Sequence, residues 1–186
     1  MRGLIKYFLI IFFIANASSQ DKLFTIIDSD QTGIHFSNDL IDTKENNVFL
    51  YANFYGGAGV GVGDFDNDGL DDLFFAGNLV DDKIYKNLGN LKFLDKTPSS
   101  GIVNDNSWST GVTVADVNND GLLDIYVSCE LYDDQPKLRT NKLYINKGNF
   151  KFDELAAEWN VDVDRRTRHA VFFDYNKDGL LDLYLL

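Results

Sequence analysis

The sequence predicts an all-β fold built from repeated units of four short strands, and three observations carry this prediction. Apolar residues occur in short runs rich in Val, Ile, Phe and Tyr, bounded by Gly, Asn and Asp, which is the pattern of β-strands. One acidic motif returns three times between such runs. In the first two repeats a turn containing Asn and Gly follows, and these residues supply the left-handed backbone angles of tight hairpins.

The acidic motif reads D-x-[DN]-x-D-G-L-x-D and recurs at intervals of 52 and 58 residues. Its copies span Asp64–Asp72, Asp116–Asp124 and Asp174–Asp182. Because strand-like runs flank every copy, each loop is predicted to be the bend of a β-hairpin. The glycine at the sixth position permits the sharp turn, since it reaches backbone angles closed to other residues.

Oxygen ligands at this spacing suit Ca²⁺, a hard cation that takes six to eight oxygens in a flexible shell. The first, third and fifth positions offer side-chain oxygens, the seventh a backbone carbonyl and the ninth another carboxylate. The predicted ligands are Asp64, Asp66, Asp68, Leu70 and Asp72; Asp116, Asn118, Asp120, Leu122 and Asp124; and Asp174, Asn176, Asp178, Leu180 and Asp182. Without a cation, carboxylates this close together would repel one another.

Two alternatives to such a calcium site are an EF-hand and an acidic turn. An EF-hand opens with the same letters but needs a Glu at position twelve and a helix on each side, whereas position twelve here is Phe75, Val127 or Leu185. An acidic turn that binds nothing is the second alternative. Three copies in one register between strands favour calcium over that turn.

Each complete repeat holds four predicted strands, which is the content of one β-propeller blade. In the first repeat the third and fourth strands are residues 83–86 and 91–94, and in the second they are residues 142–145 and 150–152. The predicted blades span about residues 56–102, 108–161 and 168–186, the last incomplete. The fold class is therefore all-β, a partial β-propeller, and because a propeller needs at least four blades, we expect the remaining blades C-terminal to residue 186.

The repeats resemble the FG-GAP/VCBS type, found in the β-propeller of integrin α-subunits and in secreted bacterial proteins. The sequence around the acidic motifs is similar to that of the group related to cartilage acidic protein, whose members often carry an ASPIC/UnbV domain. The stretches that carry this resemblance, which covers about residues 24–186, are Tyr55–Val60, Trp108–Val112 and Phe172–Tyr175.

The resemblance implies that a strand from the N-terminus completes a blade formed by the far C-terminus. Residues 21–28 read as one strand, and Phe24…Ile34 is similar to Phe93…Ile102 at the end of the first repeat. Residues 20–55 are therefore assigned an N-terminal strand and a connecting loop. The resemblance also implies that the calcium loops share one face of the propeller. The opposite face would carry residues 76–82, 97–109, 128–141 and 155–169, where a ligand could bind.

Residues 1–19 have the pattern of a secretory signal peptide. Arg2 and Lys6 precede the apolar run 7–14, which is too short to span a bilayer, and Ala15-Asn16-Ala17 resembles a cleavage site. No second apolar segment follows that could cross a membrane. We therefore expect a secreted or cell-surface protein from a bacterium, in surroundings where calcium is near millimolar.

Composition narrows the function classes further. The net charge of −12 argues against nucleic-acid binding, which needs a basic surface. Cys129 is the single cysteine, so no internal disulfide can form, and a small buried residue is favoured over a nucleophile. The cationic cluster Arg165, Arg166, Arg168 and His169 could bind a carboxylate or anionic glycan, but a solvated loop balanced by Asp162 and Asp164 is favoured over that.

The first functional hypothesis is a non-catalytic, calcium-stabilised propeller that binds an extracellular protein or carbohydrate and serves adhesion. The alternative is the propeller part of an exported polysaccharide-degrading or phospholipase-type enzyme whose catalytic residues lie outside these 186 residues. A structural protein of the cell wall or matrix is a third, weaker hypothesis. Histidine is scarce, with two residues, and the prominent carboxylates are assigned to metal, which disfavours acid–base catalysis by these residues.

Overall fold

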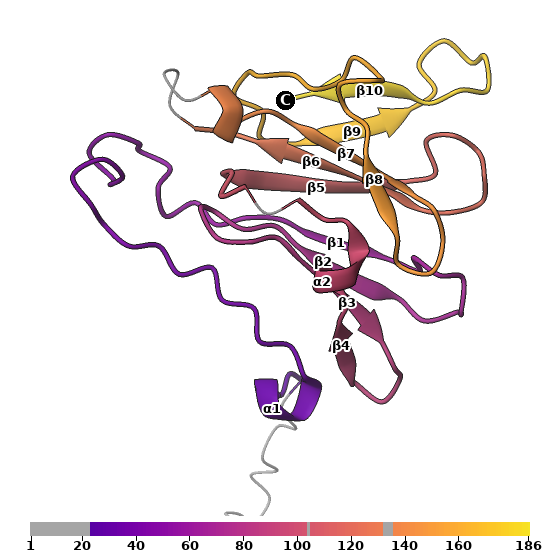
Figure 1. Ribbon diagram of the computed structural model, residues 1–186, viewed down its shortest axis with the longest axis horizontal. Helices are drawn as coiled ribbons and strands as arrows, with labels where there is room; N and C mark the ends of the chain where they lie inside the picture. Colours follow the sequence, from indigo (N-terminus) through magenta and orange to yellow (C-terminus); the bar gives the residue numbers. More distant parts are fainter. Residues whose placement is uncertain (1–22, 104, 132–135) are drawn as a thin grey trace, which may run out of the picture.

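The computed structural model describes residues 23–103, 105–131 and 136–186. Strands dominate this part of the chain, and they form three antiparallel sheets, stacked one on the next (Figure 1). The first sheet contains β1 (Val60–Gly63), β2 (Asp72–Phe75), β3 (Lys83–Asn87) and β4 (Phe93–Asp95); the second contains β5 (Ser109–Ala115), β6 (Asp124–Cys129), β7 (Lys142–Asn146) and β8 (Phe152–Glu154); the third contains β9 (Ala170–Phe173) and β10 (Asp182–Leu185). The short helices are α1 (Ser29–Thr32), α2 (Thr97–Ser100) and the 3₁₀ turn η2 (Pro136–Leu138).

The first two sheets have the same strand order, β1-β2-β3-β4 and β5-β6-β7-β8. Each is a meander in which consecutive strands pair, as in a propeller blade. The prediction of an all-β partial propeller with four short strands per repeat is confirmed. The predicted signal peptide, residues 1–19, lies outside the described residues, and the domain boundaries stay predictions.

The hairpins that bear the acidic loops have one common register. Gly63 pairs with Asp72, Ala115 with Asp124, and Phe173 with Asp182. The last aspartate of each motif is therefore the first residue of a strand rather than part of a free loop. This fixes the ninth position of every motif to the sheet.

The sheets pack through apolar side chains between neighbouring inner strands. Phe74, Ile84 and Tyr144 belong to the core between the first two sheets, and Tyr126 and Ala170 to the core between the second and third. Strand β1 supplies glycines where it crosses β5, and a Cβ added at Gly61 would lie 2.7 Å from Val112 Cγ1. Small residues therefore set the close spacing of the blades.

Residues 23–28, part of the predicted N-terminal strand, join no sheet among the described residues, and Leu23 and Phe24 are about nine-tenths exposed. The blade that this strand would complete is expected C-terminal to residue 186, so the strand stays a prediction. A strand needs a hydrogen-bonding partner, and the described chain provides none for this segment. The chain continues through α1 and then crosses the face of the first sheet that points away from the second. There Phe36 stacks on Phe75 with ring centroids 5.1 Å apart, and Asn38 exchanges two hydrogen bonds with Asn78.

Candidate metal-binding loops

The backbone of the three acidic loops takes the same two left-handed positions in every copy. Position six is glycine with φ of +88°, +84° and +88° in Gly69, Gly121 and Gly179, as the sequence indicated. Position four is also left-handed, with φ of +58°, +58° and +64° in Asn67, Asn119 and Lys177. Sequence analysis missed the second position, although Asn in two copies was a usable signal, because Asn tolerates this conformation better than most residues.

The first carboxylate of each loop organises the turn by accepting two backbone hydrogen bonds. Asp64 accepts from the N–H groups of Asp68 at 3.0 Å and Gly69 at 2.7 Å. Asp116 and Asp174 repeat the arrangement with the same positions, at 3.1 and 2.9 Å in both loops. Since a carboxylate has about four lone-pair sites, each oxygen retains capacity for a cation.

The ninth carboxylate ties the loop to the sheet. Asp72 is fully buried and accepts hydrogen bonds from the N–H groups of Phe65 at 2.9 Å and Asn87 at 2.7 Å. Asp124 does the same with Val117 and Asn146. Burial raises the pKa of Asp72 to about 6, and the two hydrogen bonds oppose that rise. A bound cation would compensate for the lost hydration of this carboxylate.

Three carboxylates converge in the first loop. One oxygen each from Asp64, Asp66 and Asp72 lies within 4.8 Å of the other two. The Oδ1 atom of Asp66 is buried and has no hydrogen-bond partner in the described part of the chain, which is costly unless something else binds it. An all-oxygen donor set with one oxygen left unsatisfied fits calcium, with Asp64, Asp66 and Asp72 as its side-chain ligands.

The second and third loops have asparagine in place of Asp66. The amide nitrogen of Asn118 donates to Asp120 at 2.9 Å, and that of Asn176 donates to Asp178 at 2.8 Å. The fifth-position aspartate of each loop also accepts from the N–H of the seventh-position leucine, Leu70, Leu122 or Leu180, at 2.9, 2.9 and 2.8 Å. All fifteen predicted ligands therefore lie in three similar turns, and metal ligation by them stays a prediction.

A lysine that sequence analysis did not single out lies on the first loop. The ammonium group of Lys86, in β3, forms ion pairs with Asp66 and, at 2.7 Å, with Asp68. Aligning the two complete repeats could have revealed this lysine. Lys86 precedes Asn87 in β3, whereas Ile145 precedes the matching Asn146 in β7. The first loop thus differs from the second by one extra carboxylate and one opposing cation.

The loops of neighbouring repeats lie on one edge of the stack and are bonded to each other (Figure 1). The side-chain amide of Asn67 donates to the carbonyl of Gly121 at 3.1 Å. The side-chain amide of Asn146 donates to the carbonyl of Phe65 at 2.9 Å. The loops are therefore coupled across the blade boundary.

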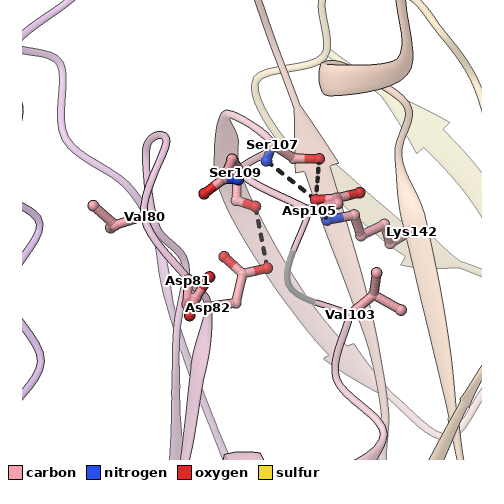
Figure 2. A pocket seen from close by; sticks show the side chains of 9 residues that line it. Val80, Asp81, Asp82, Val103, Asp105, Ser107, Ser109 and Lys142 are labelled. Carbon is pink, nitrogen blue, oxygen red and sulfur yellow. Dashed lines mark hydrogen bonds and ion pairs between the residues drawn. The ribbon is translucent and has the colours of Figure 1, made fainter.

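The opposite edge of the first two sheets carries a tight polar cluster (Figure 2). Asp82 is buried and accepts hydrogen bonds from the N–H of Gly77 at 2.8 Å and the hydroxyl of Ser109 at 3.1 Å. Lys142 pairs with Asp105 at 2.7 Å. The space between these side chains has no room for a water-sized molecule, and the cluster joins the first two blades.

The predicted cationic cluster is at least partly neutralised. Arg168 Nε lies 3.0 Å from Glu130 Oε2, and Arg165 Nε lies 3.9 Å from Asp164 Oδ1.

Burial raises the pKa of the Cys129 thiol to about 12, which fits a structural thiol. Trp108 is buried, whereas Trp159, in the turn after β8, is 43% exposed.

Comparison with known proteins shows what the repeats are similar to. Residues 64–127 match the model of the FG-GAP-like repeat. The chain is also 26% identical over 176 residues to Cartilage acidic protein 1 of Xenopus tropicalis, a match that covers 93% of this chain and 26% of that relative. The predicted resemblance to FG-GAP repeats and to the cartilage acidic protein group is confirmed, and the chain spans about a quarter of the length of this relative. Within the described residues, no helix is both long and apolar enough to cross a bilayer.

Proposed function

We propose that this chain is part of an exported, calcium-binding β-propeller module that binds an extracellular protein or carbohydrate without catalysing a reaction. The observation that carries the calcium assignment is the convergence of one oxygen each from Asp64, Asp66 and Asp72 within 4.8 Å. In addition, Asp66 Oδ1 is buried and has no hydrogen-bond partner among the described residues. The same turn recurs in two further loops with the same backbone hydrogen bonds.

Calcium would act here as a structural cation. It would neutralise carboxylates at the edge where the loops of adjacent repeats are hydrogen-bonded to each other. Outside cells calcium is near millimolar, so sites with dissociation constants of about 10⁻⁴–10⁻³ M would be occupied. Binding to the native state alone must stabilise it.

A ligand surface is best supported at the edge opposite the loops. A depression of about 250 Å³ lies there beside the second sheet, and Lys137, Thr140 and Asp162 are among its lining residues. Donors and acceptors are mixed across it, which suits hydroxyl groups of a sugar or polar groups of a protein. These residues fall within the segments that the resemblance assigned to the ligand face.

Two experiments test the proposal. Titration calorimetry of the full chain should show heat of binding for calcium that is absent for magnesium at the same concentration. A glycan array should then give binding with the sugars recovered unchanged. No calcium heat would overturn the metal assignment, and release of shortened sugars would overturn the non-catalytic assignment.

A further inference from the structure

A lysine of the neighbouring strand β3 lies against the first loop. Lys86 Nζ contacts the carboxylates of Asp66 and Asp68, two of the five ligands predicted for this loop. The Asp66 side chain is 16% exposed and that of Lys86 is 21% exposed, so water screens the pair less than it would a surface ion pair. The other oxygen of Asp66, Oδ1, has no hydrogen-bond partner in the part of the chain that the structure describes.

The position of Lys86 is set by the sheets and not by the loop. Lys86 pairs with Leu94 of β4, so the backbone from which its side chain extends is fixed in the sheet. The ammonium group also lies 5.5 Å from the ring centroid of Phe150, in the turn between β7 and β8 of the second sheet. An aromatic ring at this distance attracts a cation, so Phe150 also helps to hold the ammonium group beside the first loop.

We propose that Lys86 is a built-in counterion that competes with calcium at the first loop. In the absence of calcium it neutralises Asp66 and Asp68 and keeps the loop ordered. When calcium binds, the ammonium group gives up these two carboxylates. The second loop has Ile145 at the corresponding strand position, so it lacks this competing lysine. The inference rests on the proposed calcium binding.

Replacing Lys86 by Gln tests this in the full chain. The amide resonances of Gly69, Gly121 and Gly179 report the three loops separately in a two-dimensional NMR titration with calcium chloride. Removing the competing charge should lower the calcium concentration at the Gly69 midpoint about tenfold or more, while the Gly121 midpoint stays unchanged. Without calcium, the variant should melt at a lower temperature than the wild type, because Asp66 and Asp68 lose their counterion.

Matched variants separate the possible outcomes. Lys83→Gln removes a lysine from the same strand that pairs with Asp95 at 3.5 Å, and it should leave the Gly69 midpoint unchanged. Lys86→Arg keeps the charge and should retain the wild-type midpoint. A Gly69 midpoint that is unchanged or higher in Lys86→Gln would overturn the inference. If none of the three glycines responded to calcium in any variant, the proposed function itself would be wrong.

Discussion

The side-chain amide of Asn146 in β7 donates a hydrogen bond of 2.9 Å to the backbone carbonyl of Phe65, in the loop of the preceding repeat. Both residues are fully buried. The same amide donates to Leu123 at 3.0 Å, and the Asn146 Oδ1 atom accepts from Gly148 at 2.8 Å. One side chain thus closes its own hairpin, supports its own loop and bonds to the loop of the adjacent blade.

Asn146→Ala should therefore lower the free energy of unfolding by roughly 2–4 kcal/mol, because it leaves several buried polar groups unpaired. The first sheet provides the control. Asn87 makes the two equivalent local bonds, to Asp71 and from Gly89, and Asn87→Ala should cost roughly 1–2 kcal/mol. Denaturant unfolding measures both values, and equal losses would show that the bond across the blade boundary contributes nothing.

Much of this fold follows from local sequence. The short apolar runs, the acidic loops and the Asn-Gly turns predicted four strands per repeat, because each of these signals acts within a few residues. The N-terminal strand was predicted from the run at residues 21–28 and from the likeness of Phe24…Ile34 to Phe93…Ile102 at the end of the first repeat. A strand depends on the partner it pairs with, and no local pattern in residues 23–28 could reveal whether that partner was present.

The candidate site was predictable in its residues but not in its connections. Spacing alone identified the aspartates of all three loops. It did not reveal that both oxygens of Asp72 accept backbone hydrogen bonds, nor that Lys86 contacts Asp66. These relations join residues brought together by strand pairing, so they become visible only when the register of β2 against β3 is known.

Gly61→Ala tests the close packing of blades. The added Cβ would lie 2.7 Å from Val112 Cγ1 and 3.0 Å from Val114 Cγ2, so the sheets must move apart or repack. We expect a loss of roughly 1–3 kcal/mol in unfolding free energy. Adding Val112→Ala should recover about 1 kcal/mol relative to the sum of the single losses. A gain in stability from Gly61→Ala alone would contradict this account of the interface.

Asp82 predicts a pH effect on stability. Burial raises its pKa from the ordinary value of 3.8 to about 6, so the folded state binds the proton more tightly than the unfolded chain. This contribution to stability is present below about pH 4 and is lost as the pH rises through about 6, by roughly 3 kcal/mol.

Asp82→Asn should remove that dependence and be more stable than the wild type at pH 7, since an amide can still bond to Gly77 and Ser109. The difference in unfolding free energy between variant and wild type from pH 4 to 7 isolates this group. The exposed neighbour Asp81→Asn is the control. A constant difference over this pH range would contradict the account of Asp82.

The most direct test of the calcium assignment compares the thermal melting of the full chain in about 1 mM calcium and in EDTA. Extracellular calcium sites are occupied at this calcium concentration, and a cation that binds only the native state raises its melting temperature. The matched control replaces Asp64, Asp116 and Asp174 together by Asn, which retains an oxygen at each first position but removes the charge. We predict that calcium raises the melting temperature of the wild type by several degrees and that the triple variant loses this response. Identical wild-type melts in calcium and EDTA would contradict the claim that these loops bind calcium.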